Sequence, residues 1–350
     1  MNEQPANHKP KRFFLLAVGD EKRASSRLRI WDHRDWFATQ GEVATDYVVP
    51  QNMGGGRLLL RILKRYPSWI SNVLRADVIV VQETLAIAPL LLIRAIFKRK
   101  LMIFDFSDPV DRHGRGLKGY LRKLGFHIMV RRSDHVMVEN RRYLSDPVLQ
   151  DTSRSCFYGP VDATRLKAGR KTNEQRHPLR IGWTGSPSTL HFLKPIFPAL
   201  DRLAAHHDIE LALMGCNDVP YDFQRLKIKT FQWSQAGEFD FLPTIDLGLF
   251  ALEHTDDGAR RGAGKLFLYL AAGIPFAASE WGIAADVMGE CGAGFPVASS
   301  DKWESVLSQA ITSEELRDQF SAKGQNYAEN NISYEVYRSH LCEIMREKTK

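Results

Sequence analysis

The chain has 350 residues, of which 44% are hydrophobic and 25% are charged, and its net charge is +7. This composition is typical of a globular protein of about two domains and excludes a disordered or low-complexity chain. No run approaches the about 20 apolar residues of a membrane-spanning helix, and the first apolar segment, residues 13–18, is too short for a signal peptide. The four cysteines are widely spaced without a CxxC pattern, so we expect reduced thiols and a cytoplasmic chain.

Short apolar runs alternate with longer amphipathic stretches, which predicts an α/β fold with parallel sheets. In the N-terminal half we expect strands at residues 13–18, 47–49, 78–81, 101–104 and 135–138. Helices are expected over residues 26–39, 58–74 and 85–98, the second with a break near Pro67. The polar stretch AGRKTNEQRH, residues 168–177, predicts a linker, so we assign residues 1–167 to an N-terminal domain and residues 168–178 to the connection.

The same alternation restarts after the linker. Strands are expected at residues 179–183, 209–214, 228–231, 247–250 and 275–278, and helices at residues 189–205, 265–272, 304–310, 314–328 and 334–347. The prolines at 195 and 198 should distort the first of these helices, whereas Gly273 and Pro275 should end the second. We therefore predict a second domain over residues 179–330 and a C-terminal helical segment, residues 331–350, that packs back on the first domain. Two Rossmann-like domains would face each other across a cleft, with the site at the carboxyl ends of the strands.

Basic clusters lie only in the N-terminal half, at residues 9–12, 94–100, 112–123 and 131–132. A solvated basic surface and peripheral attraction to an anionic membrane both explain them. Nucleic-acid binding is disfavoured because no recognised nucleic-acid module accompanies the charge.

The most informative segment is GAGKLFLYLAAGIPFAAS, residues 262–279. Its glycine-rich start precedes a predicted helix, whose exposed N–H groups favour a phosphate. Lys265 adds a charge at that point, and Arg260 and Arg261 lie just upstream. An ordinary helix start with basic residues around it is the alternative interpretation.

This segment resembles the "K-L-x-x-Y-M-A-x-G-x-P-V-x-A-S" stretch of glycosyltransferase family 4, the group-1 family with the GT-B fold. RIGWTGSPST (180–189), FDFLPTIDLGLFALEHTDD (239–257) and WGIAADVMGECGAGFPV (281–297) resemble further family segments in the same order. ASSRLRIWDH (24–33), ADVIVVQ (76–82), FDFSDPV (104–110), SDHVMVEN (133–140) and YGPVDATRL (158–166) match more loosely.

The resemblance implies a retaining glycosyltransferase that takes a nucleotide-diphosphate sugar as co-substrate, with no other cofactor, and a saccharide or lipid-linked acceptor. Lys265 and Arg261 would stabilise the leaving diphosphate. The implied donor-binding residues are Gly185, Ser186, Trp233, Ser234, Glu253, Asp257, Gly264 and Leu266. No Asp-x-Asp motif occurs in the sequence, so we expect no metal.

One departure from the family opens other functions. A Glu-x7-Glu pair that much of the family carries near the donor is replaced by Arg260 and Leu268. A non-catalytic GT-B protein that binds a nucleotide-sugar or a partner is therefore an alternative, and a nucleotide-sugar epimerase is another.

On the acceptor side the candidates are Ser26 and Arg27, after the first predicted strand, and Asp105 and Asp108, after a later one. Ser26 has an alternative role as a helix N-cap. The aspartates have an alternative role as caps or as ion-pair partners of Arg112 or Arg115.

Overall fold

The computed structural model describes residues 10–50, 55–92, 100–108, 110, 116–168 and 177–348. The predicted linker, residues 168–178, and the end of the predicted helix at residues 85–98 lie largely outside them. The chain forms two compact units. Unit 1 comprises residues 1–157 and 340–350, and unit 2 comprises residues 158–339.

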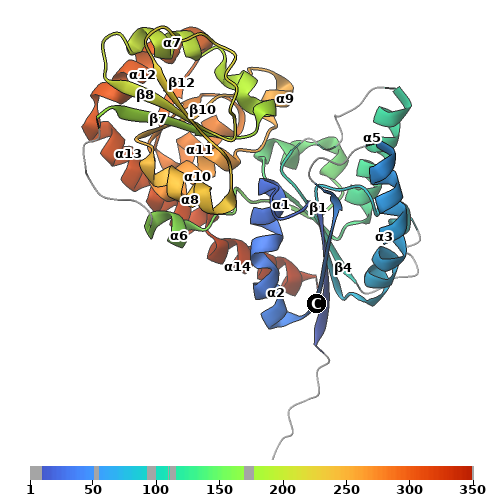
Figure 1. Ribbon diagram of the computed structural model, residues 1–350. Helices are drawn as coiled ribbons and strands as arrows, with labels where there is room; N and C mark the ends of the chain where they lie inside the picture. Colours follow the sequence, from blue (N-terminus) through green and yellow to red (C-terminus); the bar gives the residue numbers. More distant parts are fainter. Residues whose placement is uncertain are drawn as a thin grey trace, which may run out of the picture. The chain divides into compact units, whose positions relative to one another are not determined.

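Unit 1 contains a six-stranded sheet in the order β2-β1-β3-β4-β5-β6, in which every strand pair is parallel (Figure 1). This is a doubly wound order whose direction of winding reverses between β1 and β3. All five predicted strands are confirmed, and a short sixth was not predicted. The strands are β1 (Lys11–Gly19), β2 (Gly41–Val49), β3 (Val78–Gln82), β4 (Leu101–Phe106), β5 (His135–Val138) and β6 (Arg154–Cys156).

The helices of unit 1 differ from the prediction in several places, and α5 (Gly116–Arg132) was not predicted. The helix expected over residues 26–39 is divided into α1 (Ala24–Arg29), η1 (Trp31–His33) and α2 (Arg34–Gln40). The break expected near Pro67 is absent: Pro67 lies on the exposed side of a continuous helix, where water can hydrate the carbonyl that loses its partner. The remaining helices are α3 (Gly55–Arg75), α4 (Ala88–Leu91), α5 (Gly116–Arg132), η3 (Arg141–Ser145) and η4 (Pro147–Leu149).

Unit 2 contains a second parallel six-stranded sheet, in the order β12-β11-β10-β7-β8-β9. This is the Rossmann order, and the winding reverses between β7 and β10. The five predicted strands are again confirmed. The strands are β7 (Leu179–Thr184), β8 (Ile209–Met214), β9 (Lys227–Phe231), β10 (Leu247–Phe250), β11 (Phe276–Ser279) and β12 (Phe295–Val297).

The helix predicted over residues 189–205 is wrong in its first half, because the prolines at 195 and 198 leave a 3-10 turn, η5 (Pro187–Leu193), before α7 (Phe197–Leu203). The predicted end at Gly273 is confirmed, since this residue is left-handed with φ 65°. The remaining helices are α6 (Ala163–Ala168), α8 (Gln235–Phe241), η6 (Leu242–Thr244), α9 (Asp256–Ala259), α10 (Gly264–Ala272), α11 (Gly282–Cys291), η7 (Ser300–Lys302), α12 (Trp303–Thr312), α13 (Glu314–Tyr327), η8 (Ala328–Ile332) and α14 (Tyr334–Glu347).

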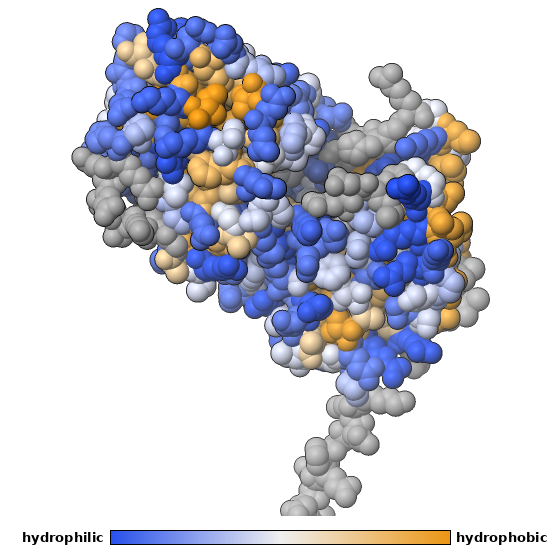
Figure 2. Space-filling model, viewed as in Figure 1, coloured by the Kyte–Doolittle hydropathy of each residue, from blue (hydrophilic) through white to orange (hydrophobic). Residues whose placement is uncertain are grey.

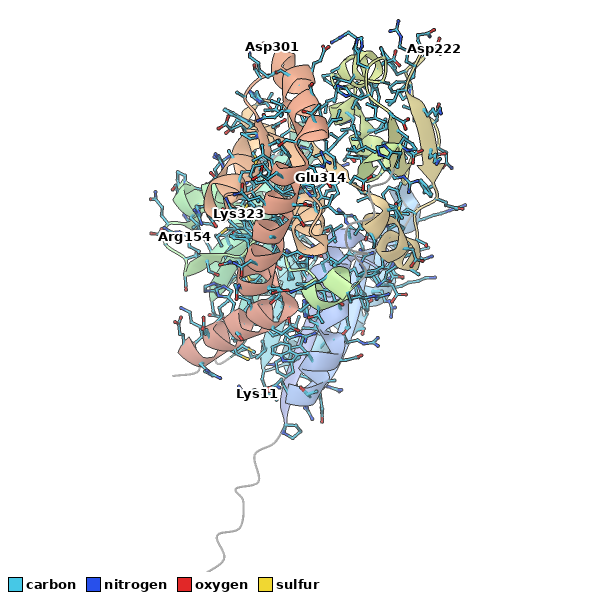
Figure 3. All side chains as sticks on the ribbon, turned by 90° about the vertical axis from the view of Figure 1, so that its left-hand side faces the viewer. Lys11, Arg154, Asp222, Asp301, Glu314 and Lys323 are labelled. Atoms are coloured by element: carbon cyan, nitrogen blue, oxygen red, sulfur yellow. The ribbon has the colours of Figure 1, made fainter. Side chains whose placement is uncertain are left out.

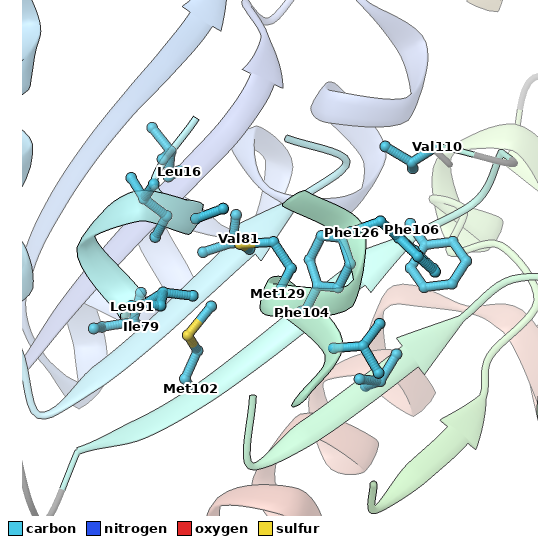
Figure 4. Packing of buried hydrophobic residues seen from close by; sticks show 14 of the residues in the cluster. Leu16, Ile79, Val81, Leu91, Met102, Phe104, Phe106, Val110, Phe126 and Met129 are labelled. Carbon is cyan, nitrogen blue, oxygen red and sulfur yellow. The ribbon is translucent and has the colours of Figure 1, made fainter. Parts of the chain in front are cut away.

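Each unit has a core of its own. In unit 1, α3, α4 and α5 pack on one face of the sheet, where Phe104, Phe106 and Phe126 lie among aliphatic residues of the strands (Figure 4). In unit 2 the corresponding cluster joins η5, α7 and α12 to the sheet. Exposed charged residues cover the outer helices of unit 2, as at Asp301, Glu314 and Lys323 (Figure 3).

The last turns of α14 belong to unit 1. The His340 ring stacks on Phe157 with centroids 5.6 Å apart, and its Nε2 is hydrogen-bonded to Ser155 Oγ at 2.8 Å. Ser155 Oγ in turn meets His135 Nε2 at 2.8 Å. In the described part of the chain, no helix combines the length and the apolar character that crossing a membrane requires.

Candidate functional site

The candidate site lies in unit 2, at the carboxyl edge of its sheet. The winding reverses there between the adjacent strands β7 and β10, and open α/β sheets bind ligands outside the strand ends at such a point. The turn after β7, the loop after β10 and the start of α10 supply most of the residues predicted from the sequence.

The turn after β7 holds Lys265 at close range. A Cβ atom added to Gly185 would lie 2.6 Å from Lys265 Cε and 2.5 Å from two ring atoms of Trp183. Lys265 Nζ itself stands 5.2 Å from the centroid of the Trp183 ring, a cation–π geometry. Gly185 therefore has to be glycine, and the stem of Lys265 lies across it.

A second glycine, Gly215, packs closely against this turn. Gly215 follows β8 with φ 89°, and a Cβ there would come within 2.2 Å of the Gly185 carbonyl oxygen. The next residue, Cys216, is buried, and burial raises the pKa of its thiol while the nearby charge of Lys265 opposes that rise. Lys265 thus lies close enough to Cys216 for its charge to act on the thiol.

The start of α10 has the features of an anion site. Its N-cap residue is Ala263, which has no side chain able to cap the helix, and no acidic residue stands in the first turn. Gly264 is exposed and Lys265 is partly exposed, so this helix end is accessible from solvent within unit 2. The positive end of the helix dipole and a lysine coincide there.

Two arginines precede that helix. Arg261 places its guanidinium carbon 5.1 Å from the centroid of the Phe192 ring, on η5. Arg260 contacts Asp256, with 3.5 Å between Nε and Oδ1. Arg261 and Lys265, the two residues predicted to stabilise a leaving group, therefore both lie against the β7–η5 segment.

α10 is fixed to the sheet by a buried tyrosine. The Tyr269 hydroxyl donates to the carbonyl oxygens of Gly182 at 3.3 Å and Leu249 at 3.4 Å, and burial raises its pKa. Leu266 is fully buried, so its side chain does not face a ligand. Leu268, at the position of the family glutamate, is also buried.

The loop after β9 carries the predicted base-pocket residues. Trp233 is partly exposed, and its indole N–H donates to Glu238 Oε1 at 3.2 Å. The same oxygen accepts from Thr184 Oγ1 at 3.3 Å. Ser234 caps α8 by accepting from the Gly237 N–H at 3.0 Å. Glu238 thus orients Trp233 toward the end of β7.

The loop after β10 presents the predicted sugar-binding carboxylates. Glu253 and Asp257 are both exposed, and Glu253 Oε1 lies 3.8 Å from His191 Nε2. Ser279, at the end of β11, fixes this loop by accepting from the Leu252 N–H at 3.1 Å.

The acceptor-side candidates lie in unit 1, also at strand ends. Ser26 is fully buried; its hydroxyl accepts from the Gly19 N–H at 3.0 Å and donates to Gln82 Oε1 at 2.9 Å. The N-cap of α1 is Arg23 and not Ser26. Arg27 is buried beside it, whereas Asp108 is partly exposed.

Asp105 belongs to a buried ion-pair network that is centred on Arg29. Its Oδ1 lies 2.6 Å from Arg29 Nη1, and Arg29 Nη2 lies 3.0 Å from Glu139 Oε2. Arg29 Nη2 also donates to the Phe157 carbonyl at 2.9 Å. Asp105 is therefore paired with Arg29, while the predicted alternatives, Arg112 and Arg115, lie outside the described residues.

Glu83 adjoins this network, since its N–H donates to the Asp105 carbonyl oxygen at 2.8 Å, although the sequence did not indicate it. It has φ 52°, which is rare for a residue with a side chain. Its carboxylate accepts from Ser25 Oγ at 3.0 Å and from the Ser107 N–H at 3.1 Å. The sequence feature that could have indicated Glu83 is a polar residue directly after an apolar strand. Glu139, directly after β5, shows the same feature.

Among the described residues, no three His, Cys, Asp or Glu side chains gather so as to hold a metal ion.

No protein-family model and no curated protein sequence matches the chain. Solved structures do share its fold. A glycosyltransferase from Rickettsia africae matches with a TM-score of 0.70 at 13% identity, covering 97% of this chain and 99% of that one. Anabaena HepE in complex with UDP matches with a TM-score of 0.68 at 14% identity, covering 96% of this chain and 100% of that one. WaaG, a glycosyltransferase involved in lipopolysaccharide biosynthesis, matches with a TM-score of 0.65 at 14% identity, covering 95% of this chain and 99% of that one. The predicted fold class of two Rossmann-like domains is confirmed, and it is the fold of GT-B glycosyltransferases.

Proposed function

We propose that this chain is a glycosyltransferase that moves a sugar from a nucleotide-diphosphate sugar to a saccharide or lipid-linked acceptor. The observation that carries the proposal is the start of α10, where Lys265 and Arg261 lie against the β7–η5 segment at the winding reversal of the unit 2 sheet. The shared fold agrees with it, and HepE was solved with UDP and with UDP-glucose.

The chemistry follows from charge. When the bond between the sugar and the diphosphate breaks, negative charge develops on the diphosphate, and donors held in place beforehand lower the barrier. Lys265, Arg261 and the first N–H groups of α10 supply positive charge, so we propose a metal-independent transfer. We propose that it is retaining because the resemblance to glycosyltransferase family 4 implies it. Gly185 and Ser186 let the backbone approach the phosphates.

The remaining residues bind the donor. Trp233 and Ser234 contact the nucleobase, and Glu253 and Asp257 hydrogen-bond sugar hydroxyls. In unit 1, Ser26, Arg27 and Asp105 position the acceptor loops through their buried contacts, and Asp108 contacts the acceptor. We also propose that the protein contacts an anionic membrane peripherally.

The test is donor turnover in Lys265→Met, which keeps the apolar stem over Gly185 and removes the charge. We expect kcat for UDP-sugar hydrolysis or transfer to fall about 100-fold, as for loss of one preorganised donor. Lys265→Arg should recover part of the activity. Lys227→Met, an exposed lysine of β9, is the matched control and should behave as wild type. Unchanged turnover in Lys265→Met would contradict the proposal.

Leu268 supports a second candidate, a GT-B protein that binds a nucleotide-sugar without catalysis. The buried leucine cannot replace the carboxylate that the family places there. Tight UDP binding without turnover for any donor and acceptor would favour this candidate.

A further inference from the structure

Large apolar side chains are exposed on one part of unit 1. Within the described residues, every exposed large hydrophobic side chain lies on α3, on α5 or just after α4. Figure 2 shows this apolar surface along the right-hand edge of unit 1, over α3 and α5. The residues are Leu59, Leu60, Leu63, Ile70, Leu74, Leu92, Leu117, Tyr120, Leu121 and Leu124.

α3 carries a second apolar stripe beside the one that packs on the sheet. Trp69 and Val73 face the core. Ile70 and Leu74 each follow one of them by a single position, so their side chains point about 100° around the helix. Leu63 lies on this second stripe as well, and it is 61% exposed. Packing in the core therefore does not explain why these exposed positions carry apolar side chains.

α5 shows the same feature on its outer face. Phe126, Met129 and Val130 pack into the core, whereas Leu117, at 74% exposed, and Leu121 lie on the opposite side. α3, α4 and α5 contribute to one core cluster, so all three cover the same face of the sheet. Their outer sides form one surface, which we call the α3–α5 face.

The charge of this face is entirely positive. α3 and α5 each contain five Lys or Arg residues and no Asp or Glu, in a chain whose net charge is only +7. Arg57, Lys64, Lys118 and Lys123 make no ion pair among the described residues. Exposed leucines flanked by unpaired basic residues are the composition of helices that lie in a lipid interface.

The positive charge also argues against a second copy of this chain as the partner that covers the α3–α5 face. A two-fold dimer would place the same face opposite itself and bring two sets of basic residues together. An anionic bilayer instead supplies both the opposite charge and the apolar layer.

We propose that the α3–α5 face is a membrane-binding surface, which lies on anionic lipid with the leucines of α3 and α5 inserted among the acyl chains. Lys and Arg side chains at its edge reach the headgroups. This binding does not depend on sugar-transfer chemistry, since no residue of the unit 2 site takes part in it.

The experiment is flotation of the full chain with vesicles, without any sugar donor. Vesicles of phosphatidylcholine alone are compared with vesicles that contain about one third phosphatidylglycerol, at low and high salt. We expect binding to the anionic vesicles only, weakened at high salt. Leu117→Ser/Leu121→Ser/Leu124→Ser should lower partitioning at least tenfold while the melting temperature and UDP binding stay unchanged, because the three side chains are exposed.

Charge reversal provides the second arm. Arg57→Glu/Lys64→Glu should lower partitioning more than tenfold, since each basic residue near the surface contributes about fivefold. The matched control is Lys227→Glu/Lys323→Glu, the same charge change at exposed sites of unit 2, and it should retain vesicle binding. Equal partitioning of all variants, or no vesicle binding by wild type, overturns the proposal. A dimer that the serine substitutions convert to monomers, with no effect of vesicles, would identify a second copy as the occupant.

Discussion

Gly185→Ala tests the donor site through geometry alone, because it adds one methyl group and no charge. The new Cβ would lie 2.5 Å from Trp183 ring atoms and 2.6 Å from Lys265 Cε, both closer than real Cβ contacts. Trp183 is 2% exposed and packed in the unit 2 core, so it cannot move freely. The stem of Lys265 has to move, and the lysine charge leaves its place at the start of α10.

Two effects follow from this displacement. Overpacking at the end of β7 should lower the free energy of unfolding by about 1–3 kcal/mol. Under the proposed function, a displaced Lys265 forfeits a charge-assisted contact with the diphosphate, about 1.5–3 kcal/mol. The Kd for UDP should therefore rise about 10- to 100-fold.

The assay is calorimetric titration with UDP, together with a melting curve. Gly289→Ala is the control, since this glycine lies inside α11 with open space around a Cβ, and alanine should stabilise that helix by about 0.5–1 kcal/mol. If Gly185→Ala binds UDP like wild type and is as stable as Gly289→Ala, the argument that Lys265 serves the donor from across Gly185 fails.

Two further predictions concern unit 1. Arg29→Met should lower the free energy of unfolding by about 3–5 kcal/mol in urea titrations, because it leaves Asp105 and Glu139 as buried charges without their cation; a loss below about 1 kcal/mol would contradict this. Burial, with smaller contributions from the charges of His340 and Lys348, lowers the pKa of His135 to about 4. The unfolded chain therefore takes up a proton at this site between about pH 6.5 and pH 4 while the folded chain does not, so stability should fall by about 3 kcal/mol on acidification through that range, and less so in His135→Gln.

Much of the fold could be predicted because buried parallel strands appear in the sequence as short apolar runs. The end of α10 could be predicted because Gly273 and Pro275 follow its last turn. α5 was not predicted, since its exposed leucines and three glycines obscure the 3.6-residue period of its core face. At the site, the sequence indicated Lys265 and Arg261 through their position before a helix. It could not indicate that they lie against Trp183 and Phe192, nor that Arg29 pairs with Asp105 and Glu139, because these contacts join residues far apart in the chain.

The two crossings of the chain between its units set an order of assembly during synthesis. The segment that stacks His340 on Phe157 leaves the ribosome only after all of residues 158–339. Unit 2 can therefore fold while the chain is still being made, whereas unit 1 waits for its closing piece. A translation product that stops before residue 340 would hold a complete unit 2 beside an unfinished unit 1.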